Sequence, residues 1–216
     1  MWRTFCAPRN LTANTVPPDE SPPGIHPEPP ADLDRRLLPI LSTDARWFRI
    51  HQSRYAALFF GRTGRYRFDA PADEYGVLYA GSDEHCAFVE TFGHSPNIRI
   101  VTMDDVKQRD LSLLTVNRPL RLVDLTSSGL ARLGADNRLC TGDYHLAQRW
   151  ALALWRHPDQ PDGLVYRSRL DPARRSVAIF DRARDALTVS SLGTLADSRH
   201  RSLLASLLDA YGIGLI

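Results

Sequence analysis

A chain of 216 residues, 43% of them hydrophobic and 24% charged, is long enough to bury a core and fits one globular domain, at most one and a half. Its formal net charge of +2 gives no strong field for nucleic acid or a membrane surface, and it has no apolar run of about 18 residues that could span a bilayer. The first residues do not resemble a secretion signal and the three cysteines lack metal-ligand spacing, so we expect a cytoplasmic protein with neither disulfides nor a metal site.

The first 32 residues are dominated by proline, with eight of the fifteen prolines of the chain before residue 31. Such a segment has too few apolar residues to pack and too many prolines to form a helix. We expect residues 1–32 to be a flexible tail that can be removed without loss of activity. A short helical segment is expected next, at residues 32–41.

Eight short segments are rich in β-branched or aromatic residues and are bounded by turn residues, which predicts strands. They are WFRIH (47–51), GRYRF (64–68), GVLYA (76–80), IRIVTM (98–103), RPLRLVDL (118–125), DGLVYRS (162–168), SVAIFD (176–181) and ALTVSS (186–191).

Helical periodicity is clearest in two places. In residues 143–157, apolar side chains recur at helical spacing from Ala147 to Trp155, and Pro158 ends the pattern. A last amphipathic helix, roughly residues 195–211, carries an apolar face that we expect to pack on the domain or to join a homodimer interface. That face consists of Leu203, Leu204, Leu207, Leu208 and Tyr211.

Strands outnumber helices and do not alternate with them regularly, which favours an α+β fold with mixed, mostly antiparallel twisted sheets. We expect a main domain at residues 33–192, followed by a C-terminal segment at residues 193–216 that contains the last helix.

The segment GVLYAGSDEHCAFVETF, residues 76–92, places one glutamate on a predicted helix. If Ser82 caps this helix, Glu90 lies about two turns in, and its neighbours one turn away are mostly small. Bulky residues such as Phe88 and Phe92 lie elsewhere around the helix and face the core, so a ligand can approach Glu90 closely. The ordinary alternative is a solvated surface glutamate.

Arginines and a serine are the other candidate site residues. Residues 48–68 mix Arg49, Arg54, Arg62, Arg65 and Arg67 with aromatic residues, and Ser168 ends the strand of residues 162–168. Arginine suits phosphate because its planar fork donates paired hydrogen bonds. Taken singly, an arginine beside an aromatic ring more often forms a stacked surface pair, and a serine at a strand end is most often a turn or cap residue.

The joint pattern is more specific. Arg49 in FRIH, Arg67 in RYRF, Tyr79 in the LYAG strand, Glu90 in FVET and Ser168 in DGLVYRS occur in an order and at approximate spacings that resemble the RES domain family, over roughly residues 45–185. The resemblance implies a fold similar to that of ADP-ribosyltransferases, with residues 33–192 as an NAD-binding catalytic domain. It also implies a bacterial toxin that depletes NAD by splitting the nicotinamide–ribose bond, with water or inorganic phosphate as acceptor.

The family's usual partner is an Xre-type helix-turn-helix antitoxin, so the resemblance implies contact with nucleic acid only through that protein, and no contact with a membrane. It further implies that Glu90 and Arg67 are catalytic, that Arg49 and Arg67 bind the pyrophosphate, that Tyr79 stacks on the nicotinamide or ribose, and that Ser168 orients the substrate. One carboxylate can suffice because nicotinamide leaves as a neutral molecule and needs no proton donor, unlike the leaving group in ordinary glycoside hydrolysis. A core tyrosine with a backbone partner is the alternative for Tyr79, and Tyr79→Phe would then be nearly silent.

Two other functions fit parts of the sequence. A mono-ADP-ribosyltransferase would use the same site with a protein acceptor, and a nucleic-acid binding module would use residues 48–68 as a stacking and phosphate-binding surface. Neither a GxGxxG motif after a strand nor a P-loop is present, and GRTG at residues 61–64 reads as a turn. Cys140, Asp143 and His145 match no known metal-ligand spacing and are explained by the start of a helix.

Overall fold

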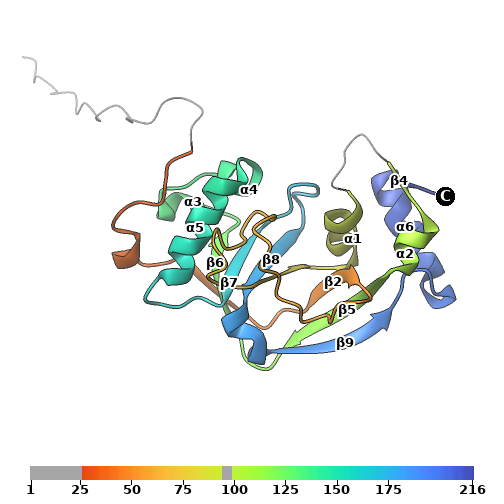
Figure 1. Cartoon of the computed structure of the whole chain (residues 1–216). Helices are drawn as coiled ribbons and strands as arrows, with labels where there is room; N and C mark the ends of the chain where they lie inside the picture. Colours follow the sequence, from red (N-terminus) through yellow and green to blue (C-terminus); the bar gives the residue numbers. More distant parts are fainter. Residues whose placement is uncertain (1–25, 94–98) are drawn as a thin grey trace, which may run out of the picture.

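The computed structural model describes residues 26–93 and 99–216, and its centre is an eight-stranded sheet (Figure 1). In spatial order the strands are β1 (Ile40–Thr43), β6 (Leu120–Leu125), β7 (Gly163–Arg167), β8 (Arg175–Phe180), β3 (Val77–Gly81), β2 (Trp47–Gln52), β5 (Arg109–Val116) and β9 (Leu187–Gly193). Among these described strands, only β6 and β7 pair in parallel. The expected α+β fold with a mixed, mostly antiparallel sheet is therefore confirmed.

Helices gather in two groups at opposite ends of the sheet (Figure 1). One group contains α3 (Ser128–Leu133), α4 (Arg138–Thr141) and α5 (Tyr144–Arg156). The other contains α1 (Glu84–Phe92), α2 (Met103–Lys107), α6 (Arg201–Tyr211) and a small parallel sheet of β4 (Ile100–Val101) and β10 (Gly214–Leu215). Three short 3-10 helices complete the described elements: η1 (Leu33–Arg35), η2 (Asp181–Ala186) and η3 (Ser198–His200).

Three apolar clusters hold these layers together, and alternating side chains of β3 contribute to two of them. Val77 belongs to the cluster that contains the buried residues of α5, whereas Leu78 belongs to a second cluster. The third cluster joins α1 to α6 through Phe88, Leu204 and Leu207. Full burial of each large apolar side chain contributes about 1.5–3 kcal/mol, so these clusters fix the positions of the helices on the sheet.

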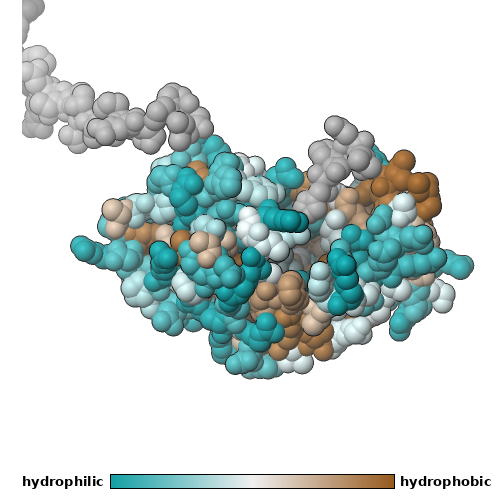
Figure 2. All heavy atoms as spheres, in the orientation of Figure 1, coloured by the Kyte–Doolittle hydropathy of each residue, from teal (hydrophilic) through white to brown (hydrophobic). Residues whose placement is uncertain are grey.

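A few large hydrophobic side chains are exposed on the described part of the molecule. On the face shown in Figure 2, one hydrophobic region covers the C-terminal elements, where Ile100 and Ile216 are exposed, and another lies below the middle of the view. The C-terminal helix predicted at roughly residues 195–211 is present but shorter, as α6, which begins at Arg201 after η3, and it packs on the domain through its apolar face.

The described part of the expected tail, residues 26–32, differs from the expectation because it packs against α5. His26 is buried and meets the Trp150 ring edge-on, and Trp150 Nε1 donates to the carbonyl of Pro27 at 2.9 Å. These contacts satisfy an indole donor that would otherwise be buried without a partner. The remainder of the predicted tail, residues 1–25, lies outside the described residues.

Other sequence predictions need correction. GRYRF (64–68) is a turn and not a strand, because the buried carboxylate of Asp69 binds the backbone amides of Arg65 and Tyr66. The predicted strand at 98–103 is reduced to β4, since Thr102 caps α2. The helical segment expected at 32–41 gives only η1 followed by β1, and β5 was not predicted.

Candidate functional site

Glu90 lies on α1, which begins after a tight turn from β3. Asp83 caps the helix, not Ser82 as predicted, and its side chain accepts a hydrogen bond from the Cys86 amide. A Cβ atom at Gly81 would lie 2.7 Å from the Cβ of Cys86, so only glycine allows the strand to end this close to the helix. This close junction presses α1 against the sheet and fixes the place of Glu90.

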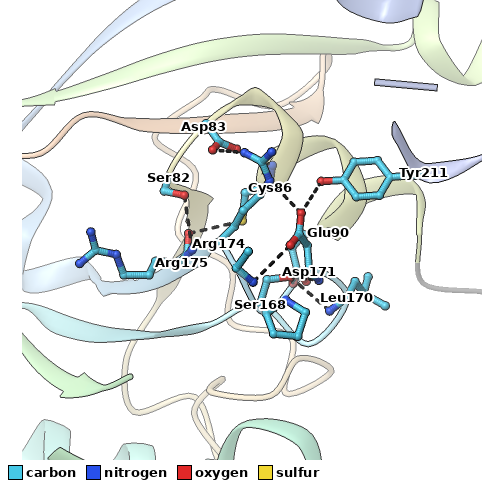
Figure 3. A network of polar contacts seen from close by, with 12 residues as sticks. Ser82, Asp83, Cys86, Glu90, Ser168, Leu170, Asp171, Arg174, Arg175 and Tyr211 are labelled. Carbon is cyan, nitrogen blue, oxygen red and sulfur yellow. Dashed lines mark hydrogen bonds and ion pairs between the residues drawn. The ribbon is translucent and has the colours of Figure 1, made fainter. Parts of the chain in front are cut away.

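Glu90 is held by Ser168, which lies 78 positions further along the chain just beyond β7. Ser168 Oγ donates to Glu90 Oε1 at 2.5 Å and accepts hydrogen bonds from the amides of Leu170 at 3.2 Å and Asp171 at 3.0 Å (Figure 3). The serine side chain is almost completely buried. A hydrogen bond to an ionised carboxylate in such a site is short and strong, so the carboxylate has a fixed orientation.

The turn that contains Arg67 is organised by Asp69 and Tyr79. The Tyr79 hydroxyl accepts a hydrogen bond from the Phe68 amide and donates one to Asp69 Oδ1, both at 3.0 Å. Burial raises the pKa of Tyr79, and the neighbouring Asp69 charge raises it further, so the phenol stays protonated. Tyr79 therefore combines a half-buried ring with a hydroxyl that anchors the arginine turn.

Arg67 is itself almost buried, with 8% of its surface exposed. Its Nη1 donates to the carbonyl of Gly142 at 2.8 Å, and its guanidinium lies 4.5 Å from the centre of the Tyr144 ring. One carbonyl and one aromatic face hold the cation in place, but neither neutralises its charge.

Tyr166 lies near enough to Glu90 and Arg67 to be affected by both charges, and the sequence did not identify it as a site residue. Burial raises its pKa, the charge of Glu90 raises it further, and the charge of Arg67 acts in the opposite direction. Both charged groups therefore lie near the same phenol. The available signal was that Tyr166 and Ser168 are two positions apart at the end of one strand, on the same side.

Arg49 on β2 is the least satisfied cation of the site. Its Nη1 is buried and has no hydrogen-bond partner in the described part of the chain. Burial lowers its pKa to about 10, an effect that the neighbouring Tyr66 only partly opposes. The Tyr66 ring in turn contacts the Tyr79 ring, with centroids 5.8 Å apart. A buried cation without a counter-charge is suited to receive an anion.

The structure thus brings the five predicted residues together to different degrees. Ser168 hydrogen-bonds Glu90, and Tyr79 on β3 hydrogen-bonds the turn that contains Arg67. Arg49 is linked to that turn through Tyr66.

The other cluster considered in the sequence has a structural explanation. Asp143 caps α5 through the Leu146 amide, and burial raises the pKa of the Cys140 thiol to about 12. A thiol with so high a pKa is almost fully protonated at neutral pH and is a poor nucleophile.

Comparison with known proteins gives a match to the RES domain family model over residues 46–203, which is most of the chain. The chain belongs to the RES domain family. It is similar to the "Probable toxin y4kH" of Sinorhizobium fredii (strain NBRC 101917 / NGR234), with 34% identity over 113 residues that cover 52% of this chain and 87% of the relative.

Its fold is similar to that of a chain in the crystal structure of the M. tuberculosis MbcT–MbcA toxin–antitoxin complex. The TM-score is 0.56 at 16% identity, and the match covers 82% of this chain and 94% of the other. None of the helices in residues 26–93 and 99–216 has both the length and the hydrophobicity needed to cross a membrane.

Proposed function

We propose that this chain cleaves NAD between nicotinamide and ribose and acts as the toxin of a bacterial toxin–antitoxin pair. Membership of the RES family supports this proposal, as do a relative named as a probable toxin and the likeness of fold to a chain from a toxin–antitoxin complex. The observation that carries it is the carboxylate of Glu90, fixed by Ser168 and lying with Arg67 around the phenol of Tyr166.

A fixed carboxylate is what this cleavage needs. When the bond between the ribose carbon and the pyridinium nitrogen breaks, its electron pair goes to nicotinamide, and positive charge develops on the ribose. Glu90 stabilises that charge directly or through a ribose hydroxyl. A preorganised electrostatic contact of this kind typically contributes about 3–4 kcal/mol to lowering the barrier, or about 100-fold to 1000-fold in rate. Ser168 supplies the preorganisation by holding one carboxylate oxygen.

The two arginines are suited to the pyrophosphate. Arg49 carries a buried nitrogen without a partner, and Arg67 is held by groups that leave its charge uncompensated. An anion bound between them would receive hydrogen bonds that no described residue takes up. Tyr79 presents a ring beside this turn, where it can contact the nicotinamide or the ribose.

The burial of these two arginines argues against their use in the nucleic-acid binding alternative, although Arg54, Arg62 and Arg65 of the same segment are exposed. A stacking and phosphate-binding surface requires exposed cations alternating with exposed rings. Here Arg67 and the Nη1 atom of Arg49 are buried, and the segment around Arg67 is a turn folded onto Asp69. The partner that we propose is a protein antitoxin, as in the complex that contains the similar chain. The family resemblance implies that this antitoxin is of the Xre type and that it contacts nucleic acid itself.

The proposal is tested by incubating the purified protein with NAD, with and without inorganic phosphate, and separating the products. Free nicotinamide with ADP-ribose indicates water as acceptor, and ADP-ribose 1″-phosphate indicates phosphate. A mass increase on an added protein extract, with no free ADP-ribose, indicates a protein acceptor instead. If NAD persists under all three conditions, the proposed cleavage is wrong.

A further inference from the structure

Tyr211, the last residue of α6, lies outside the segment matched by the family model, yet it reaches the candidate site. Gly212 follows it at φ +59°, a left-handed conformation that ends the helix immediately after the tyrosine. The chain then continues into β10, which pairs with β4. The position of Tyr211 is therefore fixed both by the helix and by the strand that follows it.

Tyr211 contacts both elements that meet at Glu90. Its ring stacks on Phe88 of α1, with centroids 6.3 Å apart and planes inclined by 15°. Its hydroxyl donates to Asp171 Oδ2 at 2.9 Å, in the loop that follows Ser168. The Tyr211 hydroxyl therefore binds the loop that follows Ser168, and the Tyr211 ring packs on α1.

The loop between β7 and β8 forms a closed set of polar contacts around Glu90 (Figure 3). Asp171 donates its amide to Ser168 Oγ at 3.0 Å, and its carboxylate also accepts from Arg174 Nε at 2.8 Å. Arg174 pairs in addition with Asp83, the N-cap of α1. These contacts run from Asp83, the N-cap of α1, through Arg174, Asp171 and Ser168 to Glu90 on the same helix, and Tyr211 of α6 joins them at Asp171.

We infer that Tyr211 is a positioning residue: through Asp171 it sets Ser168, and through Ser168 the carboxylate of Glu90. The inference deepens the proposed NAD cleavage and rests on it. If Tyr211 served only to pack against Phe88, a phenylalanine ring would be sufficient and the hydroxyl would have no role. The Tyr211 hydroxyl donates to the carboxylate of Asp171, and the backbone amide of Asp171 donates to Ser168 Oγ. Removing the tyrosine oxygen should therefore lower the rate of the reaction more than it lowers the stability of the fold.

The test compares Tyr211→Phe, Asp171→Asn and the double variant in steady-state NAD cleavage. We expect kcat to fall about tenfold in Tyr211→Phe, with KM for NAD unchanged, because the hydroxyl lost is a partner of an ionised carboxylate and is not part of the substrate site. We expect the double variant to be no slower than Asp171→Asn, because both changes break one chain of contacts. Leu208→Ala is the structural control: it trims the same apolar cluster and should lower the melting temperature without changing kcat well below melting.

Hydrogen exchange provides a readout that does not depend on activity. Amides of residues 168–174 should exchange faster in Tyr211→Phe than in the unaltered protein, and should not do so in Leu208→Ala. Unchanged kcat and unchanged exchange in Tyr211→Phe overturn the inference, as does an equal loss of kcat in Leu208→Ala. If the unaltered protein leaves NAD intact, the proposed function fails, and the exchange comparison alone decides whether Tyr211 positions the loop.

Discussion

Arg49→Met should make the protein more stable while weakening its hold on NAD. The guanidinium has a buried Nη1 atom without a hydrogen-bond partner among the described residues, and burial lowers its pKa from the ordinary arginine value to about 10. A lowered pKa means that folding disfavours the charged form, which is the form present at neutral pH. Each pKa unit corresponds to about 1.4 kcal/mol, so burying this charge costs about 3 kcal/mol, in line with the ~1–3 kcal/mol expected for an unsatisfied buried polar group.

Methionine has a similar length and no charge to desolvate, so the free energy of unfolding should rise by about 1–3 kcal/mol. For a chain of this size, each kcal/mol raises the melting temperature by about 2–4 °C. The same change should weaken NAD binding about 10-fold to 100-fold, because a hydrogen-bonded contact to a charged group is lost.

Thermal melting and calorimetric NAD titration measure these two effects, the titration in a Glu90→Gln background so that NAD is not consumed. Arg46→Met is the matched control: Arg46 is exposed three residues earlier, and its loss should leave melting and binding nearly unchanged. A lower melting temperature in Arg49→Met, or unchanged NAD affinity, would refute the reasoning.

Three further outcomes are expected. Arg67→Lys should lower NAD cleavage at least tenfold, measured by nicotinamide release, because an ammonium cannot make paired bonds to phosphate while stacking on Tyr144. Tyr79→Phe should not be silent: it leaves a backbone amide and a buried carboxylate without their partner, so urea denaturation should show a loss of about 1–3 kcal/mol. In Asp162, burial acts to raise the pKa, but the hydrogen bond from Arg118 and other contacts outweigh it and lower the pKa below 3.8. The stability that Asp162 contributes is therefore present above this value and lost as pH falls through the lower folded pKa, and acid denaturation should be shallower in Asp162→Asn.

The local pattern of β-branched and aromatic residues correctly predicted the two strands that carry or precede site residues, β3 and β7. The β-branched and aromatic segments at 76–80 and 162–168 became β3 and β7, because both are short strands buried in the sheet. The segment at 64–68 failed for a physical reason: alternating arginine and aromatic residues imitate a strand. The carboxylate of Asp69 competes for the backbone amides, and Gly64 adopts a left-handed conformation with φ +66°, so the chain turns instead.

Contacts between residues that are distant in the sequence could not be predicted from the local pattern of residue types. No periodicity relates Glu90 to Ser168, and only the resemblance to the RES family placed them in one site. Tyr166 and Tyr211 were read as strand and helix residues because their functional partners come from other elements. The packing of residues 26–32 on α5 was not predicted for the same reason. Composition does not show that the Trp150 indole donates a hydrogen bond to the carbonyl of Pro27.

The central claim is tested most directly by nicotinamide release from NAD in the unaltered protein, Glu90→Gln and Glu84→Gln. Glu84 lies in the first turn of the same helix, so it is a matched control for loss of one glutamate charge. We predict that the unaltered protein and Glu84→Gln release nicotinamide at similar rates, and that Glu90→Gln is slower by about 100-fold to 1000-fold. Equal rates in all three proteins would contradict the role assigned to Glu90, and the absence of nicotinamide in all three would contradict NAD cleavage itself.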